Sequence, residues 1–225
     1  MEAPPEGLTR TAGALAGSGV SSTRDACRMG RMPARAPAVR GLRQMSHQGW
    51  RSRGYLPHCN ERGLVQHIVF GLFDSLPAEA PPSLSRPDHR AEWADEQLDR
   101  GFGCRLLATH ANAGIVQASL LNDDGERYAL AAWCIMPTHV HVLIEQRFDA
   151  ALATIVQTWK SVAAHRINKQ MDRRGAVWQR EYFDRFMRDA EQFENTVRYI
   201  ENNPVKAGLC ERPADWPFSS ATWRR

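Results

Sequence analysis

Residues 128–145 read YALAAWCIMPTHVHVLIE, and this stretch decides the fold of the chain. Two apolar runs, residues 128–136 and 139–145, are separated by Pro137 and Thr138, a pattern typical of two antiparallel strands joined by a tight turn. Successive side chains of a strand point to opposite faces, so His139 and His141 project from the same face. The stretch therefore predicts a β-hairpin that carries a pair of neighbouring imidazoles.

The segments on either side of this hairpin predict the remaining elements. A β-branched apolar run predicts a strand at 64–72, and a further strand is expected within 177–187. Apolar periodicity and capping residues predict helices at 91–100, 110–121, 149–169 and 190–202. Asp189 is expected to cap the last helix and Pro204 to end it. The order predicts an α+β fold: a ferredoxin-like split βαβ sandwich with helices on one face of an antiparallel sheet, plus a C-terminal helix that carries Tyr199.

Composition divides the chain into a tail and one folded domain. Residues 1–53 contain nine arginines and three acids among Ala, Gly, Ser and Pro, which predicts a disordered tail. Residues 54–220 form the expected domain, and residues 221–225 a second short tail. The whole chain carries +4, but the first tail accounts for +6, so the remainder is slightly acidic. Net charge is therefore weak evidence for a nucleic-acid partner.

The cysteines and the hydropathy of the chain indicate the cellular compartment in which the protein is expected. The five cysteines are scattered and contain no C-x-x-C pair, which supports neither a disulfide framework nor a cysteine zinc site. No run approaches the roughly 18 apolar residues that a membrane span needs. We expect a cytoplasmic protein.

The His-x-His pair could hold a divalent metal, because neutral imidazole is a common ligand. Such a pair can also be structural. A histidine-triad hydrolase would need a third histidine where Leu143 stands. In a cupin, Glu145 would be at a compatible distance, but Trp133 and Leu152 occupy the positions of the cupin glycines.

A possible nucleophile lies on the last predicted helix. Tyr199 and Asn203 are four residues apart and hence on one helical face, where a phenol and an amide oxygen could reach the same metal or phosphate. The alternative is that Tyr199 packs on the sheet and Asn203 only closes the helix.

Three blocks together resemble the signature of REP-associated tyrosine transposases, which belong to the IS200-like, single-tyrosine HUH superfamily. They are residues 137–144 (PTHVHVLI), 177–184 (VWQREYFD) and 198–209 (RYIENNPVKAGL). Residues 53–58 (RGYLPH) and 216–220 (WPFSS) resemble the opening and closing stretches of the family. The resemblance spans residues 53–220, with Thr138 standing where the family usually has Asn.

The resemblance implies an activity and a set of roles. His139 and His141 would bind a divalent metal, Mg or Mn, with Asn203 as a third ligand, and Tyr199 would be the nucleophile. The implied enzyme is a transposase that cuts and joins single-stranded DNA through a 5′-phosphotyrosine, on hairpin-forming repeat DNA, possibly as a homodimer. The alternatives are an inactive protein that only binds a DNA hairpin and a cupin-like metalloenzyme.

Basic and aromatic side chains could contact the DNA backbone and stack on its bases. Core packing is the competing explanation for the aromatic ones. The candidates are Lys160, Arg166, Trp178, Arg180, Tyr182 and Lys206.

Overall fold

The computed structural model describes residues 50–52, 57–59, 63–77, 87–147 and 150–224. Most of the expected N-terminal tail lies outside these residues. The part within them, β1 (Trp50–Ser52), is not a tail: it pairs with β2 (Pro57–Cys59) as an antiparallel ribbon.

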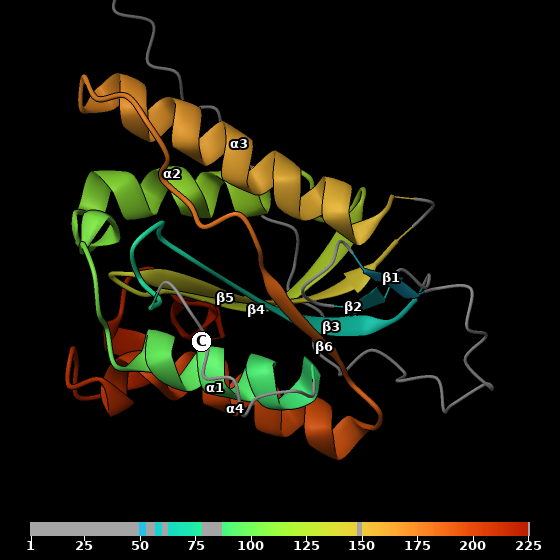
Figure 1. Cartoon of the computed structure of the whole chain (residues 1–225). Helices are drawn as coiled ribbons and strands as arrows, with labels where there is room; N and C mark the ends of the chain where they lie inside the picture. The colour runs from blue at the N-terminus through green and yellow to red at the C-terminus, as the bar shows by residue number, and fades with distance from the viewer. Residues whose placement is uncertain (1–49, 53–56, 60–62, 78–86, 148–149, 225) are drawn as a thin grey trace, which may run out of the picture.

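The centre of the molecule is a four-stranded antiparallel sheet (Figure 1). Its strands are β3 (Val65–Gly71), β4 (Tyr128–Ile135), β5 (His139–Gln146) and β6 (Phe183–Phe186), in the spatial order β4-β5-β3-β6. The predicted hairpin is confirmed, with Cys134 of β4 opposite His141 of β5. Since β5 lies between β3 and β4 and is antiparallel to both, this is the predicted split βαβ arrangement.

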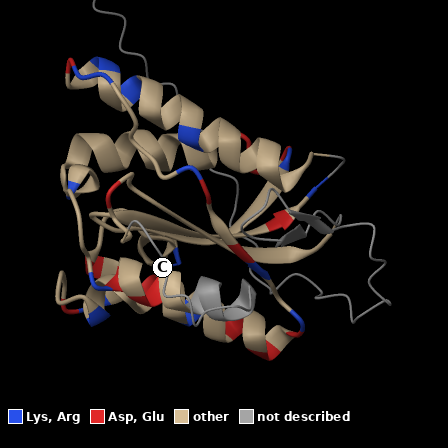
Figure 2. Cartoon of the chain, viewed as in Figure 1, with Lys and Arg blue, Asp and Glu red and all other residues tan. Residues whose placement is uncertain are grey.

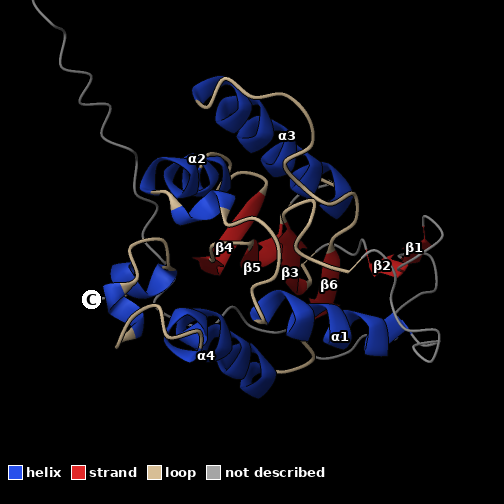
Figure 3. Ribbon diagram, turned by 60° about the vertical axis from the view of Figure 1, so that its left-hand side comes forward, coloured by secondary structure: helices blue, strands red, loops and turns tan. Residues whose placement is uncertain are grey.

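Helices cover both faces of the sheet (Figures 1 and 3). The helices of the split βαβ core, α2 (His110–Leu121) and α3 (Leu152–Gln170), lie on one face, as predicted. The opposite face is covered by α1 (Pro87–Asp99) and by α4 (Ala190–Lys206), which carries Tyr199. The sheet is thus the middle of three layers, and α1 and α4 enclose one side of it.

The period of two in β5 assigns its side chains to these layers. Val140, Val142 and Ile144 belong to the larger apolar cluster, which also contains core residues of α2 and α3. Leu143 belongs to the second cluster, together with Phe193 and Ile200 of α4. His139 and His141 have the same parity as Leu143, so the imidazoles point toward the layer of α1 and α4.

Helix α4 differs from the prediction at its end. Asp189 caps it as expected, since its Oδ1 accepts a hydrogen bond of 2.7 Å from the Gln192 amide. Pro204, however, does not terminate the helix, which continues to Lys206. The final turn is held by bonds that need no proline N–H: Ala207 N donates to Asn203 O, and Leu209 N donates to Pro204 O.

The C-terminal residues are not a tail either. A short 3-10 helix spans Ser220–Trp223, and the Trp223 ring packs edge-on against Trp133 with 5.3 Å between centroids. Arg224 bonds the Glu201 carboxylate and the Ala131 carbonyl. An apolar ring and a paired guanidinium anchor this segment, which the few residues after 220 could not reveal.

Candidate metal and nucleophile site

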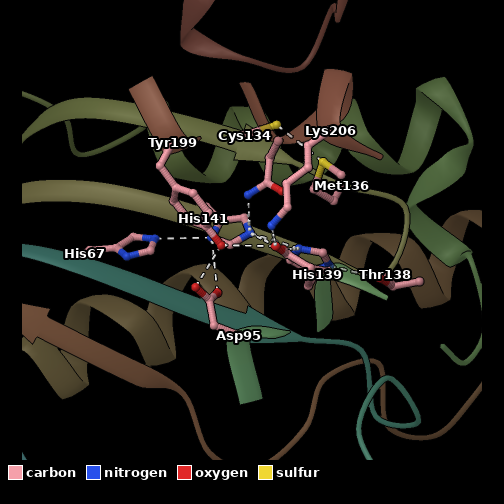
Figure 4. Close-up of polar contacts among 11 residues, drawn as sticks. His67, Asp95, Cys134, Met136, Thr138, His139, His141, Tyr199 and Lys206 are labelled. Carbon is pink, nitrogen blue, oxygen red and sulfur yellow. Dashed lines mark hydrogen bonds and ion pairs between the residues drawn. The ribbon is translucent and has the colours of Figure 1, made fainter. Parts of the chain in front are cut away.

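Two buried imidazoles face each other on β5. The Nε2 atoms of His139 and His141 are 2.9 Å apart, and the two side chains are essentially inaccessible to solvent. The outer ring nitrogens have other partners: His139 Nδ1 lies 2.9 Å from Thr138 Oγ1, and His141 Nδ1 lies 3.2 Å from His67 Nε2 of β3 (Figure 4). The pair is therefore held in place from both sides.

The neutral, unprotonated state of these rings favours a metal between them. Burial lowers the pKa of His139 to about 3, with the neighbouring His141 as the second cause. Burial also lowers the pKa of His141 well below its usual value, and that of His67. All three are neutral near pH 7, which is the form that binds metals. When Nδ1 of each β5 histidine donates outward, two Nε2 lone pairs face each other, an arrangement that a cation stabilises.

Helix α4 brings the candidate nucleophile and the candidate third ligand to the same place. Asn203 is buried, and its amide Nδ2 is 3.0 Å from His141 Nε2. The two ends of a carboxamide have nearly the same shape, so the amide oxygen fits the same position. Tyr199, one turn earlier, has its ring 5.6 Å from that of His141 and perpendicular to it. The structure thus brings His139, His141, Tyr199 and Asn203 together.

Helix α1 adds two carboxylates that the sequence reasoning missed. Tyr199 donates a hydrogen bond of 2.8 Å from its hydroxyl to Asp95 and a longer one of 3.3 Å to Asp99. Lys206 Nζ donates to Asp99 at 2.7 Å. Asp95 and Asp99 are four residues apart in the predicted helix at 91–100. This spacing places both carboxylates on one helical face and could have identified them as a pair. His67 was also missed, although a histidine within an apolar strand is itself a signal.

The charges set the state of the phenol. Burial raises the pKa of Tyr199 above its ordinary value, and the negative charges of Asp95 and Asp99 raise it further. Tyr199 is therefore a protonated hydrogen-bond donor at neutral pH.

These side chains form a group that could hold a metal ion. One ligand atom from each of Asp99, His139 and His141 lies within 4.8 Å of the others. Two imidazole nitrogens and a carboxylate oxygen suit divalent ions such as Mn²⁺ and Zn²⁺, and the oxygen also suits Mg²⁺.

A pocket of about 640 Å³ opens beside this group. Tyr199, His67 and Lys206 line it, together with several acids of α1, β6 and α4. Figure 2 shows red segments on both α1 and α4. The acids are Asp95, Glu96, Asp99, Asp184, Asp189 and Glu191. The approach to the site is thus acidic, in keeping with the slightly acidic charge of residues 54–225.

Three of the expected DNA contacts lie in the core instead. Lys160 and Trp178 are each 8% exposed, and Tyr182 is equally buried. Lys160 Nζ donates to three backbone carbonyls, at 2.6 Å to Gln179, 3.0 Å to Arg180 and 3.4 Å to Glu181. Burial argues against the expectation for these residues: Trp178 Nε1 donates to the Lys160 carbonyl, so Lys160 and Trp178 hold the segment before β6 against α3, and Tyr182 belongs to the larger apolar cluster. Charge and aromaticity alone did not distinguish that role.

The remaining basic candidates are accessible. Arg166 is exposed on α3, and the Arg180 side chain is 91% exposed. Lys206 is 61% exposed and lies at the candidate site itself, where it bonds Asp99.

A split βαβ sheet that presents two histidines to a tyrosine on a following helix defines the class of this domain. Residues 122–203 match the family described as "Transposase IS200 like". This segment is thus similar to the IS200-like transposases, which confirms the resemblance found in the sequence.

Individual relatives agree with this assignment. A Haemophilus influenzae protein described as "Putative REP-associated tyrosine transposase" is 31% identical over 103 residues, covering 41% of this chain and 58% of the relative. One of Escherichia coli is 28% identical over 94 residues, covering 41% of this chain and 54% of the relative. The chain thus spans little more than half the length of these relatives.

A solved structure shares the fold. It is described as a REP-associated tyrosine transposase bound to a REP hairpin, and it matches with a TM-score of 0.52 at 18% identity. The match covers 74% of this chain and 81% of the other. Among the described residues, no helix is long and apolar enough to cross a membrane.

Proposed function

We propose that this protein is a transposase that cuts and rejoins single-stranded DNA through a 5′-phosphotyrosine, with Tyr199 as the nucleophile. A divalent metal, Mg or Mn, would be held by His139, His141 and Asn203. One observation carries the proposal: the Tyr199 ring lies against His141, whose Nε2 faces that of His139 at 2.9 Å. Nucleophile and metal ligands are thereby in one place, on elements far apart in sequence.

The chemistry is a transesterification at phosphorus. Tyr199 Oη loses its proton and forms a bond to phosphorus, while the bond from phosphorus to the 3′-oxygen breaks and that oxygen takes up a proton. Asp95 and Asp99 orient the phenol through their hydrogen bonds. When bound, a divalent metal polarises the non-bridging oxygens of the phosphate and offsets their charge. The phosphotyrosine conserves the ester bond, so a different 3′-OH can reverse the reaction and join new ends.

A hairpin-forming repeat is the substrate that the relatives favour. The solved relative is bound to a REP hairpin, and a hairpin flanked by single strands supplies an accessible phosphate. Arg166, Arg180 and Lys206 are the exposed cations that we assign to backbone contacts. Every ligand and nucleophile named here comes from one chain, so a homodimer is not needed to complete the site.

The test is the formation of a covalent adduct. The protein is incubated with a single-stranded DNA hairpin labelled at its 3′ end, the end that stays with the phosphotyrosine, and with Mn²⁺ or Mg²⁺, and adducts are separated on a denaturing gel. Wild-type protein should give a labelled band of protein mass, and Tyr199→Phe should give none. Tyr182→Phe is the matched control, because Tyr182 is buried in the core and its loss should leave the adduct.

Other outcomes would select the alternatives. Hairpin binding in a gel shift with no adduct under any metal condition would indicate an inactive binding protein. An adduct from Tyr199→Phe would move the nucleophile to another residue. A cupin-like metalloenzyme is not favoured, because the observed sheet is flanked by helices and is not a jelly roll.

A further inference from the structure

Among the described residues, Asp99 is the one carboxylate within 4 Å of both His139 and His141. Its Oδ1 lies 3.8 Å from His139 Nε2 and 3.8 Å from His141 Nε2. The same oxygen is buried and has no hydrogen-bond partner among the described residues. A buried carboxylate oxygen without a partner is costly, so its position requires an explanation.

The three atoms are spaced as ligands of one ion would be. A triangle with sides of 2.9, 3.8 and 3.8 Å has a centre equidistant from its corners. That centre is about 2.1 Å from each atom, which is the usual bond length from Zn²⁺ or Mg²⁺ to imidazole nitrogen or carboxylate oxygen. The partnerless oxygen thus stands where a third ligand belongs.

The second oxygen of Asp99 contacts the nucleophile. Oδ2 accepts hydrogen bonds from Lys206 Nζ at 2.7 Å and from the Tyr199 hydroxyl at 3.3 Å. Asp99 therefore has one oxygen on the metal position and the other on the phenol. A single rigid carboxylate can fix the distance between the two.

We propose that Asp99 is a metal ligand through Oδ1 and positions Tyr199 through Oδ2. The inference deepens the proposed function and rests on it. It assigns a metal ligand outside residues 122–203, the segment that matches the transposase family. A charged oxygen beside two neutral nitrogens makes the site better suited to Mn²⁺ and Mg²⁺ than imidazoles alone.

The competing explanation is that Asp99 is only the ion-pair partner of Lys206. The two explanations differ in what Lys206→Met does. If Asp99 is a ligand, removing Lys206 leaves the affinity for metal unchanged or higher, because a competing cation is lost. If Asp99 serves only Lys206, Asp99→Ala and Lys206→Met should affect the fold alike, and neither variant should alter metal binding.

The experiment is calorimetric titration of the full chain with MnCl₂ in the absence of DNA. Asp99→Ala should bind Mn²⁺ at least tenfold more weakly, and Asp99→Asn, which keeps the shape, should also weaken it. Glu96→Ala is the matched control, because Glu96 lies on the same helix and lines the same pocket. This variant should bind Mn²⁺ with an affinity within twofold of wild type. Circular dichroism checks that each variant is folded.

An affinity of Asp99→Ala and Asp99→Asn within twofold of wild type would overturn the proposal. This outcome is distinct from failure of the proposed function. Tyr199→Phe should retain Mn²⁺ affinity while forming no DNA adduct, so metal binding and strand cleavage are read separately. If Asp99→Ala weakens metal binding but the wild-type protein never forms an adduct, Asp99 remains a metal ligand and the proposed transposase function is rejected.

Discussion

The hydroxyl of Tyr199 donates a hydrogen bond of 2.8 Å to Asp95, a residue 104 positions earlier in the chain. This bond joins Tyr199, which lies in the segment matching the transposase family, to α1, which precedes that segment. Asp95 thus holds the proposed nucleophile in place and also opposes its ionisation, since a negative charge beside a phenol disfavours the phenolate.

Asp95→Asn should lower the pKa of Tyr199. Burial is the largest cause of the raised pKa and stays, but the charge of Asp95 is the next cause and is removed. The rate of adduct formation at a fixed pH measures the effect, because a lower pKa of the phenol gives a larger phenolate fraction and a faster attack. Glu96→Gln removes a charge from the same helix without touching Tyr199 and should leave the rate unchanged. An unchanged or slower rate in Asp95→Asn would mean that loss of the carboxylate charge does not ease ionisation of the phenol.

Mn²⁺ should stabilise the protein against heat through the histidine pair. A ligand that binds only the native state at about 100 times its Kd adds about 2.7 kcal/mol. We expect a rise in Tm with added Mn²⁺ that His141→Asn abolishes, measured by differential scanning calorimetry. His165→Asn is the control, because His165 is exposed on α3 and should retain the full rise. A rise that survives in His141→Asn would place the metal elsewhere.

The buried histidines should make the metal-free protein sensitive to acid. The pKa of His139 is depressed to about 3 by burial, so its contribution to stability is complete above its unfolded pKa of 6.5 and is lost as the pH falls toward 3. At pH 5 the loss from this residue is about 2 kcal/mol. Urea unfolding with chelator at pH 8 and pH 5 measures it, and His139→Asn should reduce the difference by a similar amount. Equal stability at both pH values would contradict the depressed pKa.

The hairpin and its histidines were predictable because they depend on local patterns. Alternation with period two in residues 139–145 sets which side chains share a face, and a four-residue spacing sets Tyr199 beside Asn203. Neither pattern depends on distant parts of the chain. The order of strands and helices then predicted the split βαβ sheet.

What the sequence did not reveal depends on tertiary packing. Whether Asp95 and Asp99 face solvent or the site follows from where α1 packs, and nothing within residues 91–100 specifies that. For Lys160 the error has the opposite sense: a cation on a helix is usually solvated, so an exposed DNA contact was expected where the side chain is buried. Here it is buried because three carbonyls at 179–181 converge on it.

Lys160 and Arg180 should therefore respond to substitution in opposite ways. Burial lowers the pKa of Lys160 to about 8, and its three carbonyl contacts make it part of the core. Lys160→Met should cost about 2 kcal/mol of unfolding free energy, because buried acceptors lose their donor, while hairpin affinity of the folded protein is kept. Arg180→Ala should change the free energy of unfolding by less than about 0.5 kcal/mol. It should weaken hairpin binding and lower by about 1 the slope of log binding constant against log salt concentration. Urea unfolding and a salt series of binding titrations separate the two effects. A stable Lys160→Met protein with weakened hairpin binding would restore Lys160 as a DNA contact.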